Sequence, residues 1–307
     1  MNEHRFDGRV AVVTGAGRGL GRAYARLLAQ RGASVVVNDL GGSMEGDGAD
    51  AGTAAAVAGE IVAAGGVALA DGSDVATPAA AQALVDAAIE RFGRLDILVN
   101  NAGIIRWAGL PDADVDNLDR HLAVHVTGSF NTIRAAWPHL VERGYGRIVN
   151  TTSTGLFGLP TNLSYATAKG GVIGLTRSLA TAGAAHGITL NLIAPAAVTR
   201  MAGQSGDIGP DSPDSPDPGP MSPALVAPMV AFLAHEDCPV TGEIYAAGAG
   251  RFARIFIAST PGYLHAGGEP TIEDVARGWA TINDESGYHV PVDLMDWSAV
   301  FTAHLRP

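Results

Sequence analysis

Short runs of β-branched and aliphatic residues alternate along this chain with longer segments rich in Ala and Leu. The runs are Arg9–Val13, Ala33–Asn38, Val67–Ala70, Leu95–Asn100, Arg147–Thr151, Thr189–Ile193 and Glu243–Ala246. Continuous apolar strands separated by helices are typical of a parallel sheet that is covered on both faces. The sequence therefore predicts an α/β fold, with a doubly wound parallel sheet of about seven strands.

Two segments depart from this alternation. Gly203–Pro223 is rich in Pro, Gly, Ser and Asp, and it is either a functional lid or a disordered insertion. Beyond the last strand, Thr271–Asp274 has the pattern of a capping box before a helix. Apolar residues follow at helical spacing: Ile272, Val275, Trp279 and Ile282. We predict one domain over residues 1–250 and a C-terminal extension over 251–307, which packs on that domain or on a partner subunit.

Composition excludes several classes of protein. The formal net charge is −11, and no basic block is present, so binding to nucleic acid or to an anionic membrane is not expected. No stretch approaches the roughly 18 apolar residues of a spanning helix, and the first residues lack the apolar core of a signal peptide. A lone cysteine, Cys238, excludes an internal disulfide and a multi-cysteine metal cluster. We expect a cytoplasmic protein with no metal among its site residues.

A glycine-rich segment, Thr14–Gly21, lies directly between the first predicted strand and the first predicted helix. Its glycines Gly15, Gly19 and Gly21 have the spacing GxxxGxG. Glycine lets the backbone turn sharply and approach a pyrophosphate, whose negative charge the N-terminus of the helix then stabilises. The loop predicts a dinucleotide-binding site.

An acidic residue, Asp39, ends the second predicted strand. In a dinucleotide site its carboxylate would accept hydrogen bonds from the adenosine ribose hydroxyls, and it would repel a 2′-phosphate. Arg18, inside the glycine loop, has the opposite effect because it could pair with a phosphate. On balance the sequence favours NAD over NADP as the cofactor.

The chain has 19 arginines and one lysine, and that lysine, Lys169, follows Tyr165 by four residues. Side chains at i and i+4 share one face of a helix, so the phenol and the ammonium can meet at one site. Oxidation of a secondary alcohol needs a base for the hydroxyl proton, and a free tyrosine has a pKa of about 10. A nearby cation stabilises the tyrosinate, so this pair is the expected catalytic centre.

Four motifs together resemble those of the short-chain dehydrogenase/reductase family, whose sheet is Rossmann-like. Thr14–Gly21 matches its TGxxxGxG loop, and Asp74-Val75 matches its adenine-contacting acid and hydrophobe. Asn100–Gly103 matches NNAG, and Tyr165 with Lys169 matches YxxxK. The resemblance covers roughly residues 5–255, and within the family it points to the (3R)-hydroxyacyl-CoA dehydrogenase unit of peroxisomal multifunctional enzymes.

The resemblance implies further site residues. The family serine that hydrogen-bonds the substrate oxygen falls at Ser153 when counted from the preceding strand, and at Thr152 when counted back from Tyr165. We favour Ser153, and Thr152 stays open. His125 stands where the family usually has the Asn of a proton relay. The implied cofactor contacts are Gly15, Arg18, Gly19, Leu20, Gly21, Asp39, Asp74, Val75, Asn101, Ala102, Gly103, Tyr165, Lys169, Pro195 and Thr199.

These features predict an NAD-dependent enzyme that interconverts a secondary alcohol and a ketone. Tyr165 would act as general base or acid, while Lys169 lowers its pKa and holds the ribose. Ser153 would orient the substrate oxygen, and His125 would relay a proton or position a water. The expected substrate is a hydroxyacyl thioester or a hydrophobic ring alcohol such as a steroid or terpenoid.

Two alternatives remain: an NADPH-dependent ketone reductase, and a non-catalytic dinucleotide-binding protein, against which the intact Tyr165 and Lys169 pair argues. The family resemblance also implies a homodimer or homotetramer.

Overall fold

The computed structural model of the chain describes residues 3–199, 201 and 219–305. Most of the predicted irregular segment Gly203–Pro223 therefore lies outside the described residues. The chain divides into two compact units, Met1–Arg254 and Ile255–Pro307. The first unit contains the sheet and its helices, and it is described first.

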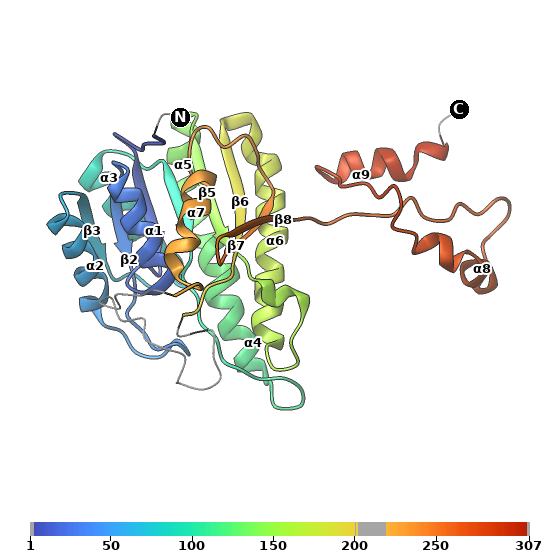
Figure 1. Cartoon of the computed structure of the whole chain (residues 1–307), viewed down its shortest axis with the longest axis horizontal. Helices are drawn as coiled ribbons and strands as arrows, with labels where there is room; N and C mark the ends of the chain where they lie inside the picture. The colour runs from blue at the N-terminus through green and yellow to red at the C-terminus, as the bar shows by residue number, and fades with distance from the viewer. Residues whose placement is uncertain (1–2, 200, 202–218, 306–307) are drawn as a thin grey trace. The chain divides into compact units, whose positions relative to one another are not determined.

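One sheet of eight strands forms the centre of this unit, in the order β3-β2-β1-β4-β5-β6-β7-β8 (Figure 1). Neighbouring strands from β3 to β7 pair in parallel. The sheet confirms the predicted Rossmann-like α/β fold, since each predicted run became a strand. The strands are β1 (Val10–Thr14), β2 (Ser34–Asn38), β3 (Val67–Asp71), β4 (Ile97–Asn100), β5 (Gly146–Thr151), β6 (Ile188–Pro195), β7 (Ile244–Gly248) and β8 (Arg251–Ile255).

The eighth strand, β8, adds one to the predicted number of about seven. It follows β7 after two residues, Ala249 and Gly250, which both adopt positive φ angles of 50° and 74°. Two such residues form the tight turn of a hairpin, which joins antiparallel strands. Alanine rarely adopts this conformation, so the local sequence gave no sign of the hairpin.

Helices cover both faces of the sheet, as the doubly wound prediction requires (Figure 1). Residues of α1, α2 and α7 pack in one apolar cluster with one face, and residues of α3, α5 and α6 pack in a second cluster with the other. The longer helices are α1 (Gly19–Gln30), α2 (Ala51–Ala63), α3 (Pro78–Phe92), α4 (Val115–His121), α5 (Gly128–Arg143), α6 (Leu163–Gly183) and α7 (Ala227–Leu233). Short helical turns are η2 (Thr154–Phe157), η3 (Ala184–His186) and η5 (Pro223–Leu225).

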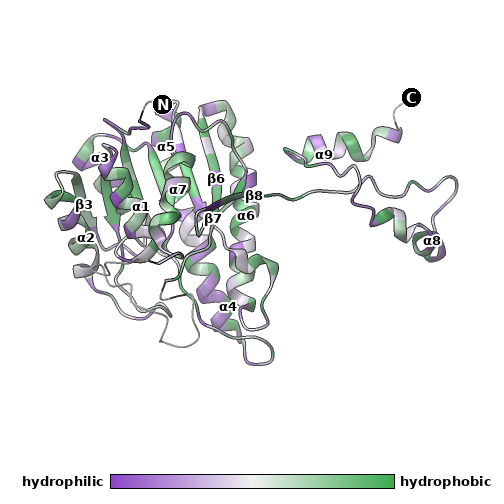
Figure 2. Ribbon diagram, in the orientation of Figure 1, coloured by the Kyte–Doolittle hydropathy of each residue, from purple (hydrophilic) through white to green (hydrophobic). Residues whose placement is uncertain are grey.

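The central strands are coloured mainly as hydrophobic in Figure 2, and they read as continuous hydrophobic runs because apolar clusters cover both faces of the sheet. Neighbours on β1 separate between the two clusters: Val13 packs with α1, and Val12 packs with α3. Both side chains are fully buried. A sheet of this kind leaves polar groups free only beyond the ends of its strands, and ligand sites in such folds lie at the carboxyl ends.

One helix is interrupted beside those carboxyl ends. Between α4 and α5 runs a π-helical segment, η1, from Leu122 to Thr127. A π-helical turn contains an extra residue and is common at functional sites. It contains His125, and the last residue of α4 is His121; both histidines are buried.

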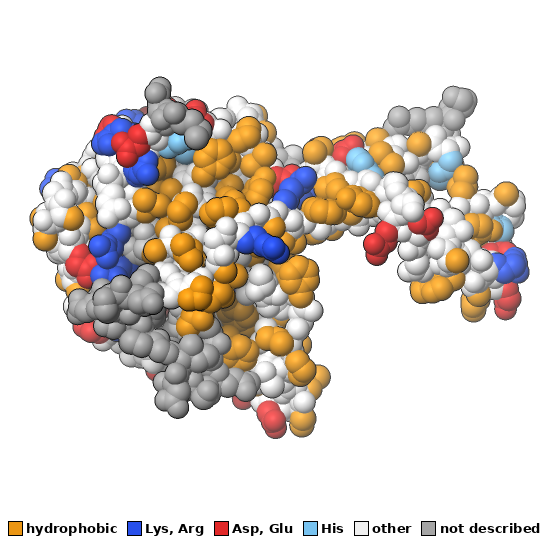
Figure 3. All heavy atoms as spheres, viewed as in Figure 1, with side chains coloured by type: hydrophobic (Ala, Val, Ile, Leu, Met, Phe, Trp, Pro, Cys, Tyr) orange, Lys and Arg blue, Asp and Glu red, His pale blue; other side chains and the backbone are white. Residues whose placement is uncertain are grey.

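The second unit contains α8 (Ile272–Ile282), α9 (Leu294–Phe301) and the short turn η6 (Ala303–Leu305). The predicted capping box is confirmed: Thr271 Oγ1 accepts from Asp274 N at 3.2 Å, and Asp274 Oδ2 accepts from Thr271 N at 2.8 Å. Many large apolar side chains of this unit are exposed (Figure 3): Ile272, Val275, Trp279, Leu294, Met295 and Phe301. Among the described residues of the whole chain, no helix is both long enough and apolar enough to cross a membrane.

Candidate active site

A pocket of about 630 Å³ opens at the carboxyl ends of the parallel strands. Its walls come from the loops after each of the strands β1 to β6, together with η1 and the start of α6. Apart from Gly21, every predicted site residue lines it: Gly15, Arg18, Gly19, Leu20, Asp39, Asp74, Val75, Asn101, Ala102, Gly103, His125, Ser153, Tyr165, Lys169, Pro195 and Thr199.

At two glycines of the loop, Gly15 and Gly21, a side chain would collide with backbone atoms. At Gly15, where φ is +61°, a Cβ would lie 2.8 Å from Cα of Ala102. At Gly21, a Cβ would lie 2.1 Å from the carbonyl oxygen of Gly15. Gly21 therefore supports the loop from behind, which explains why it does not line the pocket.

Asn101 fixes the conformation of the glycine loop. Its Nδ2 donates to the carbonyl oxygens of Thr14 and Gly15, both at 3.0 Å. In return, Thr14 Oγ1 accepts from the backbone N–H groups of Asn101 and Ala102, both at 3.0 Å. The amide of Asn101 is thus used within the protein, and its effect on a bound cofactor would be to hold the loop in place.

The carboxylate of Asp39 is held by two backbone amides. Oδ2 accepts from Gly17 N at 2.8 Å, and Oδ1 accepts from Gly41 N at 2.7 Å. The guanidinium of Arg18 donates to the carbonyl of Gly42 at 3.3 Å and to Thr53 Oγ1 at 3.1 Å. Both charges therefore have fixed positions in the same wall of the pocket.

Asp74 and Val75 form the neighbouring wall after β3. Asp74 Oδ1 accepts from the N–H of Ala76 at 2.9 Å, which closes a tight turn. Val75 is buried, and its carbonyl accepts from Asn131 Nδ2 at 3.1 Å. The loop is thus attached to α5 and presents its backbone and the Asp74 side chain to the pocket.

The sequence left open whether Thr152 or Ser153 contacts the substrate oxygen. In the structure their hydroxyls point in different directions. Thr152 is fully buried, lies outside the pocket lining, and donates from Oγ1 to the carbonyl of Lys169 at 2.9 Å. Ser153 lines the pocket, and its Oγ accepts from Gly155 N at 2.9 Å. A hydrogen bond with Ser153 also acts to lower the pKa of Tyr165. Ser153 is therefore the hydroxyl positioned toward the phenol.

Tyr165 and Lys169 lie on one face of α6, as their spacing predicts. The ammonium Nζ is 5.6 Å from the centroid of the Tyr165 ring and donates to the carbonyl oxygen of Thr151 at 2.8 Å. Burial lowers the pKa of Lys169 to about 7. Burial also raises the pKa of Tyr165 above its usual value, more than the bond from Ser153 lowers it. Desolvation of the phenol is thus the largest effect on the pKa of Tyr165, and a lowering by Lys169 stays a prediction.

Two histidines pack near the phenol of Tyr165. The ring of His125 lies edge-on to Tyr165 at 5.4 Å, and His121 stacks on His125 at 6.0 Å. Burial holds the pKa of His125 well below its usual value and lowers that of His121, so both rings are neutral near pH 7. His125 Nε2 is 2.9 Å from the carbonyl of Ile104, while its Nδ1 has no partner among the described residues.

The sequence reasoning missed several residues of the pocket. His121 stands four residues before His125, and this helical spacing was the one available signal. Trp107 and Asn162 also line the pocket, and each has a buried polar atom, Nε1 and Oδ1, without a partner in the described chain. The segments containing them are joined by a bridge between Ala108 and Asn162. Nothing local in the sequence indicates that these segments meet.

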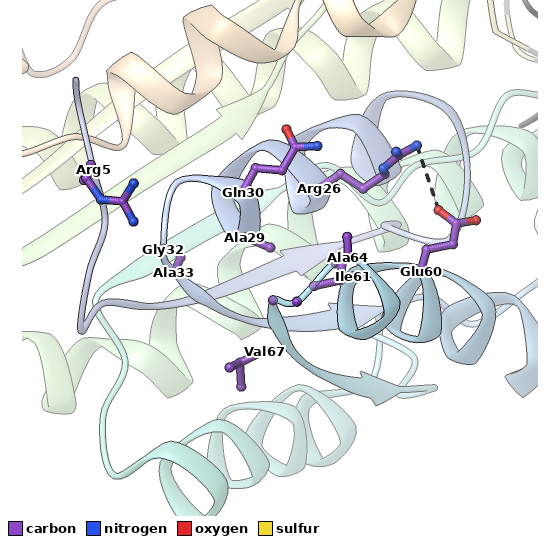
Figure 4. Close-up of a pocket in the computed structure, with 12 residues that line it drawn as sticks. Arg5, Arg26, Ala29, Gln30, Gly32, Ala33, Glu60, Ile61, Ala64 and Val67 are labelled. Atoms are coloured by element: carbon purple, nitrogen blue, oxygen red, sulfur yellow. Dashed lines mark ion pairs between the residues drawn. The ribbon is translucent and has the colours of Figure 1, made fainter.

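A second, smaller cavity of about 260 Å³ lies between α1, the end of α2 and the start of β3 (Figure 4). Its charged groups already have partners, since Arg26 pairs with Glu60 at 4.0 Å and Arg5 pairs with Asp7 at 2.6 Å. It contains none of the predicted site residues. The chemistry therefore belongs to the larger pocket.

Comparison with known proteins identifies the family. Residues 9–207 match the sequence profile of the short chain dehydrogenases. A short-chain type dehydrogenase/reductase of Mycobacterium tuberculosis is 43% identical over 280 residues, which are 91% of this chain and 95% of that protein. A crystal structure of a short chain dehydrogenase from Mycobacterium avium superimposes with a TM-score of 0.77 at 37% identity, over 90% of this chain and 94% of that one.

A third relative is larger. Peroxisomal multifunctional enzyme type 2 of Drosophila melanogaster is 42% identical over 287 residues, which are 92% of this chain and 46% of that enzyme. The chain thus spans less than half the length of this relative. The profile match, these identities and the arrangement of the pocket together lead to one conclusion: the chain belongs to the short-chain dehydrogenase/reductase family, and it is an oxidoreductase that uses a nicotinamide dinucleotide.

Proposed function

We propose that the protein is an NAD-dependent dehydrogenase that interconverts a secondary alcohol and a ketone. One observation supports this most strongly. The phenol of Tyr165, the hydroxyl of Ser153 and the buried ammonium of Lys169 line the same pocket as the glycine loop. An acid or base, a hydrogen-bonding group for the substrate oxygen and a site for a dinucleotide are therefore within one cavity.

The residues present fit a nicotinamide dinucleotide. Close packing at Gly15 and Gly21 leaves bare backbone at the N-terminus of α1, where a pyrophosphate is stabilised. Asp74 and Val75 would contact the adenine, Lys169 the nicotinamide ribose, and Pro195 and Thr199 the carboxamide. When bound, this cofactor supplies the hydride acceptor for oxidation or the hydride donor for reduction.

The preference for NAD rests on Asp39. Its carboxylate is fixed by Gly17 and Gly41 in the wall where an adenosine ribose would lie, and it would repel a 2′-phosphate. Arg18 supports the alternative, an NADPH-dependent ketone reductase, because its guanidinium occupies the same wall. Arg18 is already engaged by Gly42 and Thr53, so we favour NAD.

Proton transfer is assigned to Tyr165. Because burial raises its pKa, the phenol holds its proton near pH 7 and can donate it to a ketone oxygen. In the reverse direction the tyrosinate takes the proton of the alcohol, so oxidation should become faster as the pH rises. Ser153 would hydrogen-bond the substrate oxygen, and Lys169 would stabilise the tyrosinate. The Nδ1 of His125, which has no partner among the described residues, would form a hydrogen bond with a water or with substrate.

The substrate class follows from the remaining wall of the pocket. Apolar side chains also line the pocket: Ile104, Ile105, Leu159, Val198, Met201 and Met221. We propose a hydrophobic alcohol or ketone, first a 3-hydroxyacyl thioester and second a hydroxysteroid or terpenoid. The resemblance to the (3R)-hydroxyacyl-CoA dehydrogenase unit of peroxisomal multifunctional enzymes favours the first, and no further observation separates them.

We also propose a homodimer or homotetramer in which the C-terminal unit packs on the catalytic unit or on a partner subunit. The exposed apolar side chains of α8 and α9, such as Trp279 and Met295, support it, because a short segment rarely leaves so much apolar surface in water. A cytoplasmic location stays a prediction.

A turnover screen tests the proposal. NAD⁺ reduction would be followed with 3-hydroxyacyl-CoA, steroid and terpenoid alcohols, with Tyr165→Phe as the matched control. We expect turnover with at least one class and none by the control. If no class supports turnover with either NAD⁺ or NADP⁺, the proposal is wrong; turnover with NADP⁺ alone would establish the alternative reductase.

A further inference from the structure

We propose that His4, His235 and Asp237 form a binding site for one divalent transition-metal ion, separate from the active site. The three side chains come from the segment before β1 and from the turn after α7. One ligand atom of each lies within 4.8 Å of the others. Because His4 and His235 are so distant in the sequence, the pattern could not be recognised there, and no metal was expected.

The distances between the ligand atoms suit a tetrahedral ion. Asp237 Oδ2 lies 3.5 Å from His4 Nε2 and 3.4 Å from His235 Nδ1. Zinc bonds of about 2.0–2.2 Å at tetrahedral angles separate two ligand atoms by about 3.3–3.5 Å. Two of the three distances between ligand atoms, those that involve Asp237, therefore already have the required length. The third distance joins the ligand nitrogens of His4 and His235. Because His4 is half-exposed, its ring can turn and shorten this distance.

The buried histidine is oriented as a metal ligand usually is. His235 Nε2 lies 3.1 Å from the carbonyl oxygen of Arg5, to which it donates, and this bond leaves the lone pair on Nδ1. Metal-binding histidines commonly donate their second N–H to a backbone carbonyl, which fixes the tautomer. In the free chain Nδ1 accepts from the N–H of Asp237 at 3.1 Å, and a metal ion would replace this weak donor.

Aromatic rings hold the imidazoles from the side. Phe6 packs edge-on against His235 at 5.2 Å, and Phe232 packs edge-on against His4 at 5.9 Å. The two imidazoles themselves are 4.8 Å apart and nearly perpendicular. The contact with Phe6 supports the buried ring of His235, whereas the half-exposed ring of His4 keeps the freedom to turn toward a bound ion.

The charge around the site favours a cation. In the described part of the chain, the carboxylate of Asp237 pairs with the two histidines and with no arginine. Three arginines near the site have other partners: Arg5 pairs with Asp7, Arg9 pairs with Glu236 and Asp96, and Arg147 donates to backbone carbonyls, including that of His235 at 3.3 Å. The negative charge of Asp237 is thus available to a metal ion.

Two nitrogen ligands and one oxygen ligand select the kind of ion. Imidazole prefers Zn²⁺, Co²⁺, Ni²⁺ and Cu²⁺, whereas Mg²⁺ and Ca²⁺ prefer oxygen ligands. With three protein ligands, the fourth position would be taken by water. The site lies before β1 and after α7, at the amino ends of the strands, whereas the dinucleotide pocket opens at their carboxyl ends. Bound metal should therefore stabilise the N-terminal segment without taking part in the reaction.

The test uses the full chain without an affinity tag. Zinc would be titrated by calorimetry, and thermal unfolding would be followed with and without ZnCl₂. His4→Ala and Asp237→Asn remove one ligand each at exposed positions, and His186→Ala removes an exposed histidine elsewhere. We expect one zinc per chain, a higher Tm that EDTA reverses, and at least a roughly tenfold weaker affinity in the two ligand variants only. Substitution with Co²⁺ should give the visible absorption of tetrahedral cobalt.

Three results would overturn the proposal: no saturable zinc binding below millimolar concentration, equal zinc affinity in the ligand variants and the wild type, or release of the zinc by NADH. Mg²⁺ should raise the Tm in neither the wild type nor the variants. A Tm increase with Mg²⁺ that depends on Asp237 would mean a carboxylate cation site in place of a transition-metal site.

Discussion

The two halves of the active-site pocket differ in how their polar groups are satisfied. In the cofactor half, the side chains of Thr14, Asn101 and Asp39 are all hydrogen-bonded to backbone groups of the loops. In the substrate half, around Tyr165, the atoms Trp107 Nε1, His125 Nδ1 and Asn162 Oδ1 are buried without partners in the described chain. One half is complete before a ligand arrives, and the other is not.

This difference indicates that the cofactor and the substrate are bound in different ways. A pre-formed loop binds a common cofactor at low entropic cost, because nothing in the protein needs to be ordered. An unpartnered buried polar atom costs about 1–3 kcal/mol. A substrate that provides the missing hydrogen bonds recovers this free energy, and one that lacks them does not. The cofactor half therefore sets stability and affinity, and the substrate half sets selectivity.

The largest effect is expected from Lys169→Met, which removes the buried charge that both halves share. Turnover should fall by about 10³-fold, since the cation that stabilises the tyrosinate is lost. The free protein should become more stable by about 1–4 kcal/mol, because the buried ammonium is costly. Denaturant unfolding and steady-state kinetics check both effects, and Lys169→Arg keeps the charge as a control.

The pKa of Lys169 also determines how the free energy of unfolding changes with pH. The pKa of Lys169 is about 7 in the folded chain against 10.5 for the free side chain, so the folded state binds fewer protons between these values. The free energy of unfolding of the wild type, relative to the Lys169→Met variant, should therefore rise from pH 7 to 10.5. A difference that stays constant with pH would show that Lys169 is fully charged in the folded protein.

Asn101→Ala should have the next largest effect, because it removes the side chain that holds the glycine loop in the cofactor half of the pocket. Loss of the bonds to the carbonyls of Thr14 and Gly15 should cost about 1–3 kcal/mol of stability and weaken NADH binding by about 10–100-fold. Fluorescence titration and thermal unfolding would measure both quantities. Unchanged NADH affinity would mean that the loop keeps its shape without this side chain.

Asp39→Asn tests which dinucleotide the cofactor half of the pocket prefers. The amide keeps the size of the side chain and removes its charge, so the affinity ratio of NADPH to NADH should rise by about tenfold. Titrations with the two dinucleotides check this result, and Asp50→Asn, a cap of α2, serves as the control. If NADPH binds more tightly than NADH to the wild type, the assignment of NAD is wrong.

Asn162→Ala should have the smallest effect, and it acts on the other half. Asn162 makes no side-chain capping bond at the start of α6, and its buried Oδ1 has no partner in the described chain, so the substitution should not lower the stability. The KM for the alcohol should rise several-fold, with the NADH affinity unchanged. A drop in stability as large as that of Asn101→Ala would remove the distinction between the halves.

The cofactor half and the substrate half of the pocket also differ in how much of each could be predicted from the sequence. The strands, the glycine loop and the pair Tyr165 and Lys169 depend on local patterns, and the structure placed each as expected. The additional strand β8 was missed because Ala249 adopts a conformation that its residue type does not suggest. The choice between Thr152 and Ser153 was open in the sequence, since it depends on the carbonyl of Lys169 to which Thr152 donates.

Long-range contacts account for what could not be predicted. The segments that contain Trp107 and Asn162 are joined by the bridge between Ala108 and Asn162. The rings of His4 and His235 pack together although they lie near opposite ends of the sequence of the larger unit. The pKa of Tyr165 depends on burial, which the i, i+4 spacing alone does not indicate. Local sequence thus defined the pre-formed half of the pocket better than the half that binds substrate.

The central claim is that Tyr165 performs the chemistry in a cofactor site that is complete without it. The most direct measurement compares Tyr165→Phe with the wild type in an NADH titration and a turnover assay on the same preparations. We expect NADH affinities within about twofold of each other and a loss of at least about 10³-fold in turnover. Equal turnover in the two proteins would contradict the account.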